Sequence, residues 1–261
     1  MLVFAIQIKQ ASNTRDWEEE FAVQPTVQIQ DSVVTINNIR DWKYSDSDII
    51  SKEYISRSYD VSKLKQAWFM LEPFGKFDGV AHTYFVFDFE DQEPVSFSIE
   101  ARREKGEVYT AFTGLFRKFE MIYLWGTEQD FTVGRTLYKK NDVYMFPLIT
   151  SDNFDKKLFM ELVYKTQDLY QHPRFYNTVT SNCTNNLADF ANDVKSGTVP
   201  FHYSRYLTGY SGEFLYDLGY IPHDKSYEEI RSEYYINDFV NENYMNDNFS
   251  EKLRVHLLDN S

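Results

Sequence analysis

The sequence predicts one α+β domain, and three features indicate this class. Aromatic residues make up 18% of the 261 residues, which is too many for a disordered chain and typical of a β-rich body. Some stretches alternate apolar and polar residues as strands do, and others repeat apolar residues at helical spacing. No internal repeat and no change of composition marks a domain boundary. We therefore expect residues 1–13 to be a leader or the stub of a membrane segment, and residues 14–261 to form a single domain.

Charge and cysteine content exclude several classes of function. The net charge of −13 repels phosphate backbones, so nucleic acid is not an expected partner. Cys183 is the only cysteine, which excludes an internal disulfide and zinc sites built from several cysteines. The acidic stretches lack the spacing of a calcium loop, so we expect neither a metal nor a cofactor. The apolar run over residues 1–8 is shorter than the roughly 20 residues of a spanning helix.

The elements of the first half of the chain follow from the alternation of apolar and polar residues. We expect a hairpin of residues 26–30 and 32–36, a charged surface excursion over 44–60, a short helix or strand over 63–71, and strands over 81–89 and 95–101. In the strand over 81–89, His82 and Tyr84 lie on the face opposite Thr83 and Phe85. If the apolar faces of these last two strands share one side of the sheet, their polar faces coincide.

The second half of the chain is expected to be richer in helix. We predict a helix over 110–121, strands over 122–125 and 142–146, a helix over 152–171 that stops before Pro173, and a helix that begins near Cys183. In the last of these, Leu187, Phe190, Ala191 and Val194 recur at helical spacing, and Gly197 lies where a C-terminal cap is expected.

Cys183 is the candidate nucleophile. With Ser181 or Asn182 as N-cap, Cys183 falls in the first turn of its helix. The unpaired N–H groups and the positive end of the helix dipole favour a thiolate there. The alternative is a small apolar residue that seats the helix, since free cysteines are among the most buried residues.

A cysteine nucleophile needs a base, and usually a third group that orients the base. His82 is the best candidate base, because it begins a strand and its face also carries Ser98 and Glu100. Glu100 is the predicted orienter and Ser98 the less favoured one, and the alternative is that His82 is a satisfied core histidine. The predicted substrate-binding residues are Ser98, Tyr84, Asn182 and Arg102. Arg102 opens a mixed-sign run that either contacts an anionic head group or is ordinary surface.

Several motifs, in order between about residues 14 and 220, resemble the Lnb N-terminal periplasmic domain family. They are RDW at 15–17, VTINNIR at 34–40, HTYFVF at 82–87, SIEARRE at 98–104, GLFRKFE at 114–120, and FYNT at 175–178 leading into NCT at 182–184. The resemblance implies a circularly permuted papain-like (NlpC-type) fold, in which the histidine precedes the cysteine, as in lecithin:retinol acyltransferase.

The resemblance also implies an activity. Members of the family are similar to lipoprotein N-acyltransferases, which move an acyl chain from a phospholipid through a cysteine thioester to the N-terminal amine of a lipoprotein. Cys183 would form the thioester, His82 would act as base and Glu100 as orienter. The implied location is the periplasm, at the inner membrane face, with phospholipid and lipoprotein as partners. Such members usually carry transmembrane helices, so this chain is expected to be either a fragment or a soluble relative.

Two other functions stay open on the residues alone. The same triad could cleave an amide, as a cell-wall peptidase or amidase, or the fold could serve as a binding module without activity. Aromatic pocket walls would favour the acyl chain, and a polar cleft would favour a peptide. A cysteine beyond hydrogen-bond reach of His82 would favour the binding module.

Overall fold

The computed structural model describes residues 9–75, 77–110, 112–150 and 153–259. Within these residues, eight strands form one mixed sheet in the order β1-β2-β7-β6-β5-β4-β8, with β3 paired along the length of β2. All strand pairs are antiparallel except the short parallel contact between β2 and β7. The strands are β1 (Thr26–Gln30), β2 (Val33–Tyr44), β3 (Ile49–Asp60), β4 (Leu64–Pro73), β5 (Ala81–Phe89), β6 (Val95–Arg102), β7 (Glu120–Thr127) and β8 (Tyr144–Pro147).

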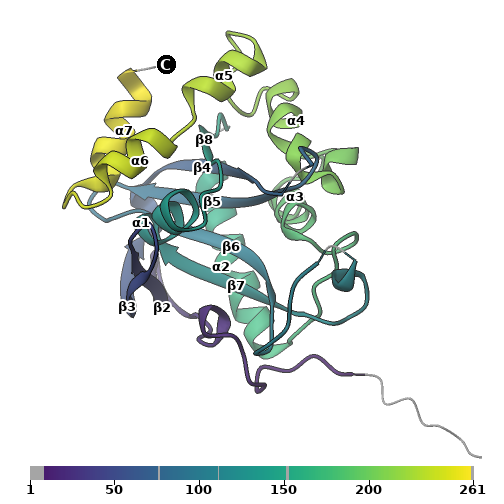
Figure 1. Cartoon of the computed structure of the whole chain (residues 1–261). Helices are drawn as coiled ribbons and strands as arrows, with labels where there is room; N and C mark the ends of the chain where they lie inside the picture. Colours follow the sequence, from purple (N-terminus) through teal and green to yellow (C-terminus); the bar gives the residue numbers. More distant parts are fainter. Residues whose placement is uncertain (1–8, 76, 111, 151–152, 260–261) are drawn as a thin grey trace, which may run out of the picture.

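Helices cover both faces of this sheet (Figure 1). They are α1 (Glu128–Val133), α2 (Phe154–Gln171), α3 (Cys183–Val194), α4 (Ser211–Asp217), α5 (Tyr227–Glu233), α6 (Asn237–Asn243) and α7 (Phe249–Asp259). Phe131 of α1 packs on Tyr84 of β5, whereas Phe159 of α2 packs on Phe87 of the same strand. Side chains 84 and 87 point to opposite faces of a strand, so α1 and α2 lie on opposite sides of the sheet.

The central strands are buried on both faces. In β5, Thr83, Phe85 and Phe87 face α2 and α3, while Tyr84 and Val86 are buried on the side of α1. This explains why the polar face expected from alternation is not a solvent-exposed face. The described residues include no helix that is long and apolar enough to cross a membrane.

The hairpin of β1 and β2 turns at Asp31, whose φ of 53° fits a tight turn, and both strands lie where the sequence places them. The strands predicted over 81–89 and 95–101 are β5 and β6, and their register pairs Tyr84 with Ser98 and Phe85 with Phe97. The expected coincidence of the two faces is therefore confirmed. The ambiguous segment over 63–71 is a strand, β4, which runs between β5 and β8.

Two predicted elements are wrong. The charged segment over 44–60 is not a surface excursion but contains β3, whose polar side chains line the outer face of a strand paired to β2. The described residues of the segment over 110–121 form the 3-10 turn Thr113–Leu115 and the start of β7 in place of an α-helix, and Thr110 and Thr113 exchange backbone and side-chain hydrogen bonds there. Sequence periodicity does not register such local competition.

Part of the predicted leader contacts the body of the protein. Lys9 Nζ donates to the Lys118 carbonyl at 3.0 Å, and the Asn13 amide donates to the Tyr170 carbonyl at 2.8 Å. The apolar run over residues 1–8 lies outside the described residues. The division into a leader and one domain stays a prediction.

Candidate active site

Cys183 is the first residue of α3, as the capping pattern predicts. The Asn182 side chain is the N-cap and accepts a hydrogen bond of 2.7 Å from the Asn185 N–H. The Asn182 amide donates in turn to the carbonyls of Thr178 and Arg205, at 2.9 and 2.8 Å. These bonds fix the start of the helix from two neighbouring loops, so Asn182 positions Cys183 and has no free polar group aimed at a ligand.

The sulfur of Cys183 is buried, with 4% of the residue exposed, and it lies 3.9 Å from Thr184 Oγ1 and within reach of the His82 imidazole. Burial alone raises the pKa of a thiol, but the charge and hydrogen bond of His82 outweigh this effect and lower the pKa of Cys183. The backbone N–H and the hydroxyl of Thr83 also donate to the sulfur and act in the same direction. A thiolate and an imidazolium are therefore the favoured pair.

Ser98 and Glu100 surround the other side of the His82 ring. His82 Nε2 lies 2.7 Å from Ser98 Oγ and 3.2 Å from Glu100 Oε1, and Ser98 Oγ donates to the same carboxylate oxygen at 2.7 Å. Since Nε2 is occupied by these two groups, Nδ1 is the ring nitrogen left for the sulfur. The structure thus places both candidate orienters at His82, with Glu100 as the charged partner and Ser98 between them.

These contacts change the acidity of both charged groups. Burial lowers the pKa of His82, but the negative charges of Glu100 and Cys183 outweigh it and raise the pKa to about 10. Burial raises the pKa of Glu100, yet the charges of His82 and Arg135 hold it well below its usual range. Glu100 is consequently a carboxylate throughout the neutral range, and His82 keeps its proton when the thiolate forms.

Arg135 contacts Glu100 and is itself bound by Glu72. Arg135 Nη2 contacts Glu100 Oε1 at 3.2 Å, and its Nε donates to Glu72 Oε2 at 2.8 Å. Asn141 donates to the second oxygen of Glu72 at 2.7 Å. The Arg135 guanidinium also lies over the Tyr84 ring, 4.4 Å from its centroid. This arrangement fixes the Glu100 carboxylate on the nitrogen of His82 that faces away from the sulfur.

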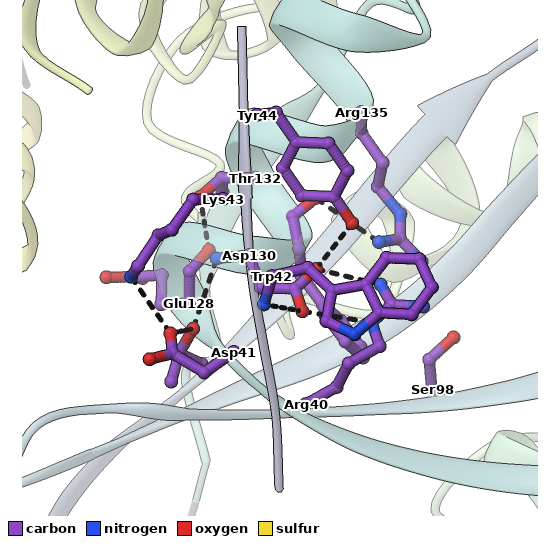
Figure 2. A network of polar contacts seen from close by, with 12 residues as sticks. Arg40, Asp41, Trp42, Lys43, Tyr44, Ser98, Glu128, Asp130, Thr132 and Arg135 are labelled. Carbon is purple, nitrogen blue, oxygen red and sulfur yellow. Dashed lines mark hydrogen bonds and ion pairs between the residues drawn. The ribbon is translucent and has the colours of Figure 1, made fainter. Parts of the chain in front are cut away.

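A second buried ion pair, between Arg40 and Asp130, lies near this cluster of charged side chains, and Figure 2 shows its contacts. Arg40 donates through Nε and Nη2 to the two oxygens of Asp130, at 2.9 and 2.8 Å, and Asp130 also accepts from the Trp42 N–H and the Tyr44 hydroxyl. The Phe131 ring lies between the Arg40 and Arg135 guanidinium groups, 5.1 and 4.7 Å from them. The Arg40–Asp130 pair is therefore connected through the Phe131 ring to Arg135, the residue that contacts Glu100.

Two of the predicted substrate-binding residues have other contacts in the structure. Tyr84 is fully buried and stacks on His82, with 5.9 Å between the ring centroids, so it forms part of the wall behind the base. Arg102 is also buried, donates to the backbone carbonyl oxygens of Phe21 and Ala22, and lies over the Trp17 ring. The expectation that Arg102 contacts a head group from the surface is wrong, because its guanidinium closes the end of the sheet against the N-terminal segment.

A pocket of about 220 Å³ lies beside the start of α3. Thr83 and Thr184 belong to its lining, and their hydroxyls are 3.0 Å apart next to Cys183. Most of the other lining side chains are aliphatic or aromatic, including Phe69, Phe85, Phe154, Leu158, Leu187, Ala188, Ala191, Phe214 and Leu215. The hollow is thus mainly apolar, and it reaches Thr184, whose hydroxyl lies 3.9 Å from Cys183 Sγ, although Cys183 and His82 do not themselves line it.

One protein-family model matches the part of the chain that carries these residues. The model of the Lnb N-terminal periplasmic domain matches residues 51–209, which is more than half of the chain and contains His82, Glu100 and Cys183. The chain belongs to the Lnb N-terminal periplasmic domain family. This membership indicates a periplasmic location. The motifs at 15–17 and 34–40 lie outside the matched range. Neither the curated proteins nor the solved structures compared with the chain gave a match.

Sequence reasoning missed two groups at this Lnb domain site. Thr83 acts on the thiol from the face of β5 that is otherwise lined by phenylalanine, and its place beside His82 on that strand was the available signal. Arg135 has no local signal, because it follows Glu100 by 35 residues and reaches it from a helical turn after α1. The condition set for a binding module, a cysteine out of reach of His82, is not met.

Proposed function

We propose that this chain is a periplasmic thiol acyltransferase that moves an acyl chain from a phospholipid to the N-terminal amine of a lipoprotein. The observation that carries the proposal is the mainly apolar pocket lined by Thr184, whose hydroxyl lies 3.9 Å from the sulfur of the buried Cys183. A peptide substrate presents amides, which need polar partners when they are buried, whereas these walls offer mainly carbon atoms. Burial of an acyl chain gains about 0.8 kcal/mol for each methylene removed from water.

The proposed reaction has two steps. The Cys183 thiolate attacks the ester carbonyl, and the His82 imidazolium gives its proton to the departing lysophospholipid alkoxide, leaving a thioester. The lipoprotein amine then attacks this thioester, His82 accepts one proton of the amine, and the Cys183 thiolate leaves as the amide forms, which restores the thiolate and imidazolium. The first N–H groups of α3 have no partner inside the helix and are the natural donors to the oxyanion of each intermediate.

We also propose that the fold is a circularly permuted papain-like arrangement. Three features support it: the cysteine begins a helix, the histidine lies on a strand of the sheet packed against that helix, and the histidine comes first in the chain. A carboxylate on the neighbouring strand occupies the remaining ring nitrogen. The order of the residues and their places on secondary structure are those that the family resemblance implies.

Filling the pocket should separate long acyl donors from short ones. Ala188 is buried and lines the pocket from α3. In Ala188→Phe, a ring occupies the space of several methylenes, and the loss of about three buried methylenes lowers the rate with a long-chain phospholipid roughly fiftyfold. The rate with a water-soluble short-chain ester should change little. The measurement is single-turnover acylation of Cys183 with each donor.

The matched control is Ser196→Phe, which adds the same ring at an exposed position beyond the end of α3. An equal loss with both donors would show damage to Cys183 and not to the pocket, and undiminished long-chain acylation would refute the pocket as the acyl site. Cleavage of a cell-wall peptide without any acylation would replace the acyltransferase by an amidase.

A further inference from the structure

The exposed phenylalanines gather in one region of the molecule. Among the described residues, every phenylalanine with a largely exposed side chain lies on a loop near the start of α3; these are Phe74, Phe77, Phe112, Phe116 and Phe201. Phe201, Phe112 and Phe116 are 74%, 69% and 63% exposed. Exposed apolar side chains scattered singly need no explanation, but a group of this size marks an interaction site.

These residues lie on three of the four loops 74–80, 106–118, 175–181 and 198–210 (all but 175–181), and the four loops together are what we call the loop rim. Figure 1 shows the β4–β5 turn and the loops around α3 along the right-hand edge of the molecule. The first and last of these loops are joined directly, since the Gly209 N–H donates to the Gly79 carbonyl at 3.1 Å.

Asn182, the residue before Cys183, joins the remaining loops. Its amide donates to the carbonyls of Thr178 and Arg205, which belong to the third and fourth loops, respectively. The Thr178 N–H donates to the Gly114 carbonyl of the second loop at 3.1 Å. Hydrogen bonds therefore connect all four loops around the residue that caps the candidate nucleophile.

The loop rim is also continuous with the apolar pocket. Four residues of the 198–210 loop line the pocket: Thr198, Val199, Ser204 and Arg205. The rim carries further exposed apolar or aromatic side chains at Val108, Val179, Tyr203, Tyr206 and Leu207. The 198–210 loop thus carries exposed aromatic side chains and also forms part of the pocket lining.

The charge of the loop rim differs from that of the whole chain. The described residues of its four segments carry three Lys or Arg and two Asp or Glu, in a protein whose net charge is −13; these are Arg117, Lys118 and Arg205 against Asp78 and Glu107. Arg205 also pairs with Asp189 at 2.7 Å. An acidic surface is repelled by anionic lipid, so the face that approaches a membrane has to be less acidic than the rest.

We propose that the loop rim is the face by which this protein lies on a phospholipid bilayer, with Phe112, Phe116 and Phe201 in the head-group region. Aromatic side chains beside scattered cations are the composition of interfacial membrane contacts. The choice of lipid as the occupant rests on the proposed function, because the rim leads into the pocket proposed for the acyl chain. On the bilayer, the rim sets the pocket against the surface from which the donor comes.

Vesicle sedimentation tests the proposal. The full chain is mixed with vesicles of phosphatidylethanolamine and phosphatidylglycerol, and the fraction bound is measured against lipid concentration. The triple variant Phe112→Ser, Phe116→Ser and Phe201→Ser should bind at least about a hundredfold more weakly, since each exposed ring that enters the bilayer contributes about tenfold. The control triple variant carries Ile50→Ser, Tyr164→Ser and Met245→Ser, which are exposed but lie off the rim, and it should bind as the wild type does.

The results of the vesicle experiment separate the membrane proposal from its alternatives. Binding of the rim variant within about twofold of wild type, or an equal loss in the control variant, overturns the proposal. A wild type that ignores vesicles but forms dimers that the rim variant cannot form assigns the rim to a second copy of the chain. Cys183→Ser should still bind vesicles, so vesicle binding without acyl transfer in the wild type would refute the proposed chemistry and leave the rim proposal standing.

Discussion

Replacing His82 with asparagine should lower the alkylation rate of Cys183 at pH 7 by about a hundredfold or more. In the wild type, the cation of His82 outweighs the burial of the sulfur and lowers the pKa of the thiol. In His82→Asn the burial remains and the cation is lost, so the pKa rises above the usual value of about 8.5 and the thiolate becomes a minor species at pH 7. Iodoacetamide labelling, followed by intact mass, measures the rate.

The alkylation rates of the wild type and of His82→Asn should also depend differently on pH. The wild-type rate should already be high at neutral pH, because the thiolate forms below its usual range and His82, with a pKa of about 10, remains protonated. The variant rate should climb steadily through the alkaline range. His172→Asn is the matched control, since His172 is exposed at the end of α2 beside Asp168. If His82→Asn reacts as fast as the wild type at pH 7, His82 does not activate the thiol.

Breaking the Arg40–Asp130 pair should destabilise the whole domain. Both side chains are buried, and in Asp130→Ala the Arg40 guanidinium keeps its charge without its bidentate partner. Removing one member of a buried ion pair lowers the free energy of unfolding by about 3–5 kcal/mol. The Trp42 N–H and the Tyr44 hydroxyl lose their acceptor as well. The urea midpoint should fall accordingly, with a similar slope.

An exposed ion pair supplies the control for this substitution. Asp16 pairs with Lys105 at 2.7 Å, but both side chains are largely in solvent. Asp16→Ala should change the free energy of unfolding by less than about 1 kcal/mol. Equal shifts in the two variants would contradict the claim that burial makes the Arg40–Asp130 pair a major determinant of stability.

The nucleophile and its immediate neighbours were accessible from the sequence because their signals are local. A cap residue, a cysteine and helical spacing identify the start of α3, and alternation along two strands places His82 on one face with Ser98 and Glu100. The same periodicity predicted a helix over 110–121 that does not form. There Thr110 and Thr113 bind each other, and two of the apolar residues counted as a helical face, Phe112 and Phe116, are exposed.

The buried ion pairs around the candidate site could not be predicted, since they depend on tertiary contacts. Arg135 meets Glu72 and Glu100 across 63 and 35 residues, and Arg40 meets Asp130 across 90. Each of these residues is charged, and sequence alone assigns such residues to the surface. Arg102 illustrates the same failure, because its mixed-sign neighbours suggested solvent and its guanidinium is buried.

The most direct test of the account is the intact mass of the protein after incubation with phospholipid vesicles, beside Cys183→Ser. The account predicts a gain of one fatty-acyl group in the wild type, removed by hydroxylamine and absent from the variant. The same gain in Cys183→Ser would contradict Cys183 as the acyl carrier. No gain in a wild type whose thiol alkylates rapidly at neutral pH would contradict acyl transfer while leaving the activated cysteine in place.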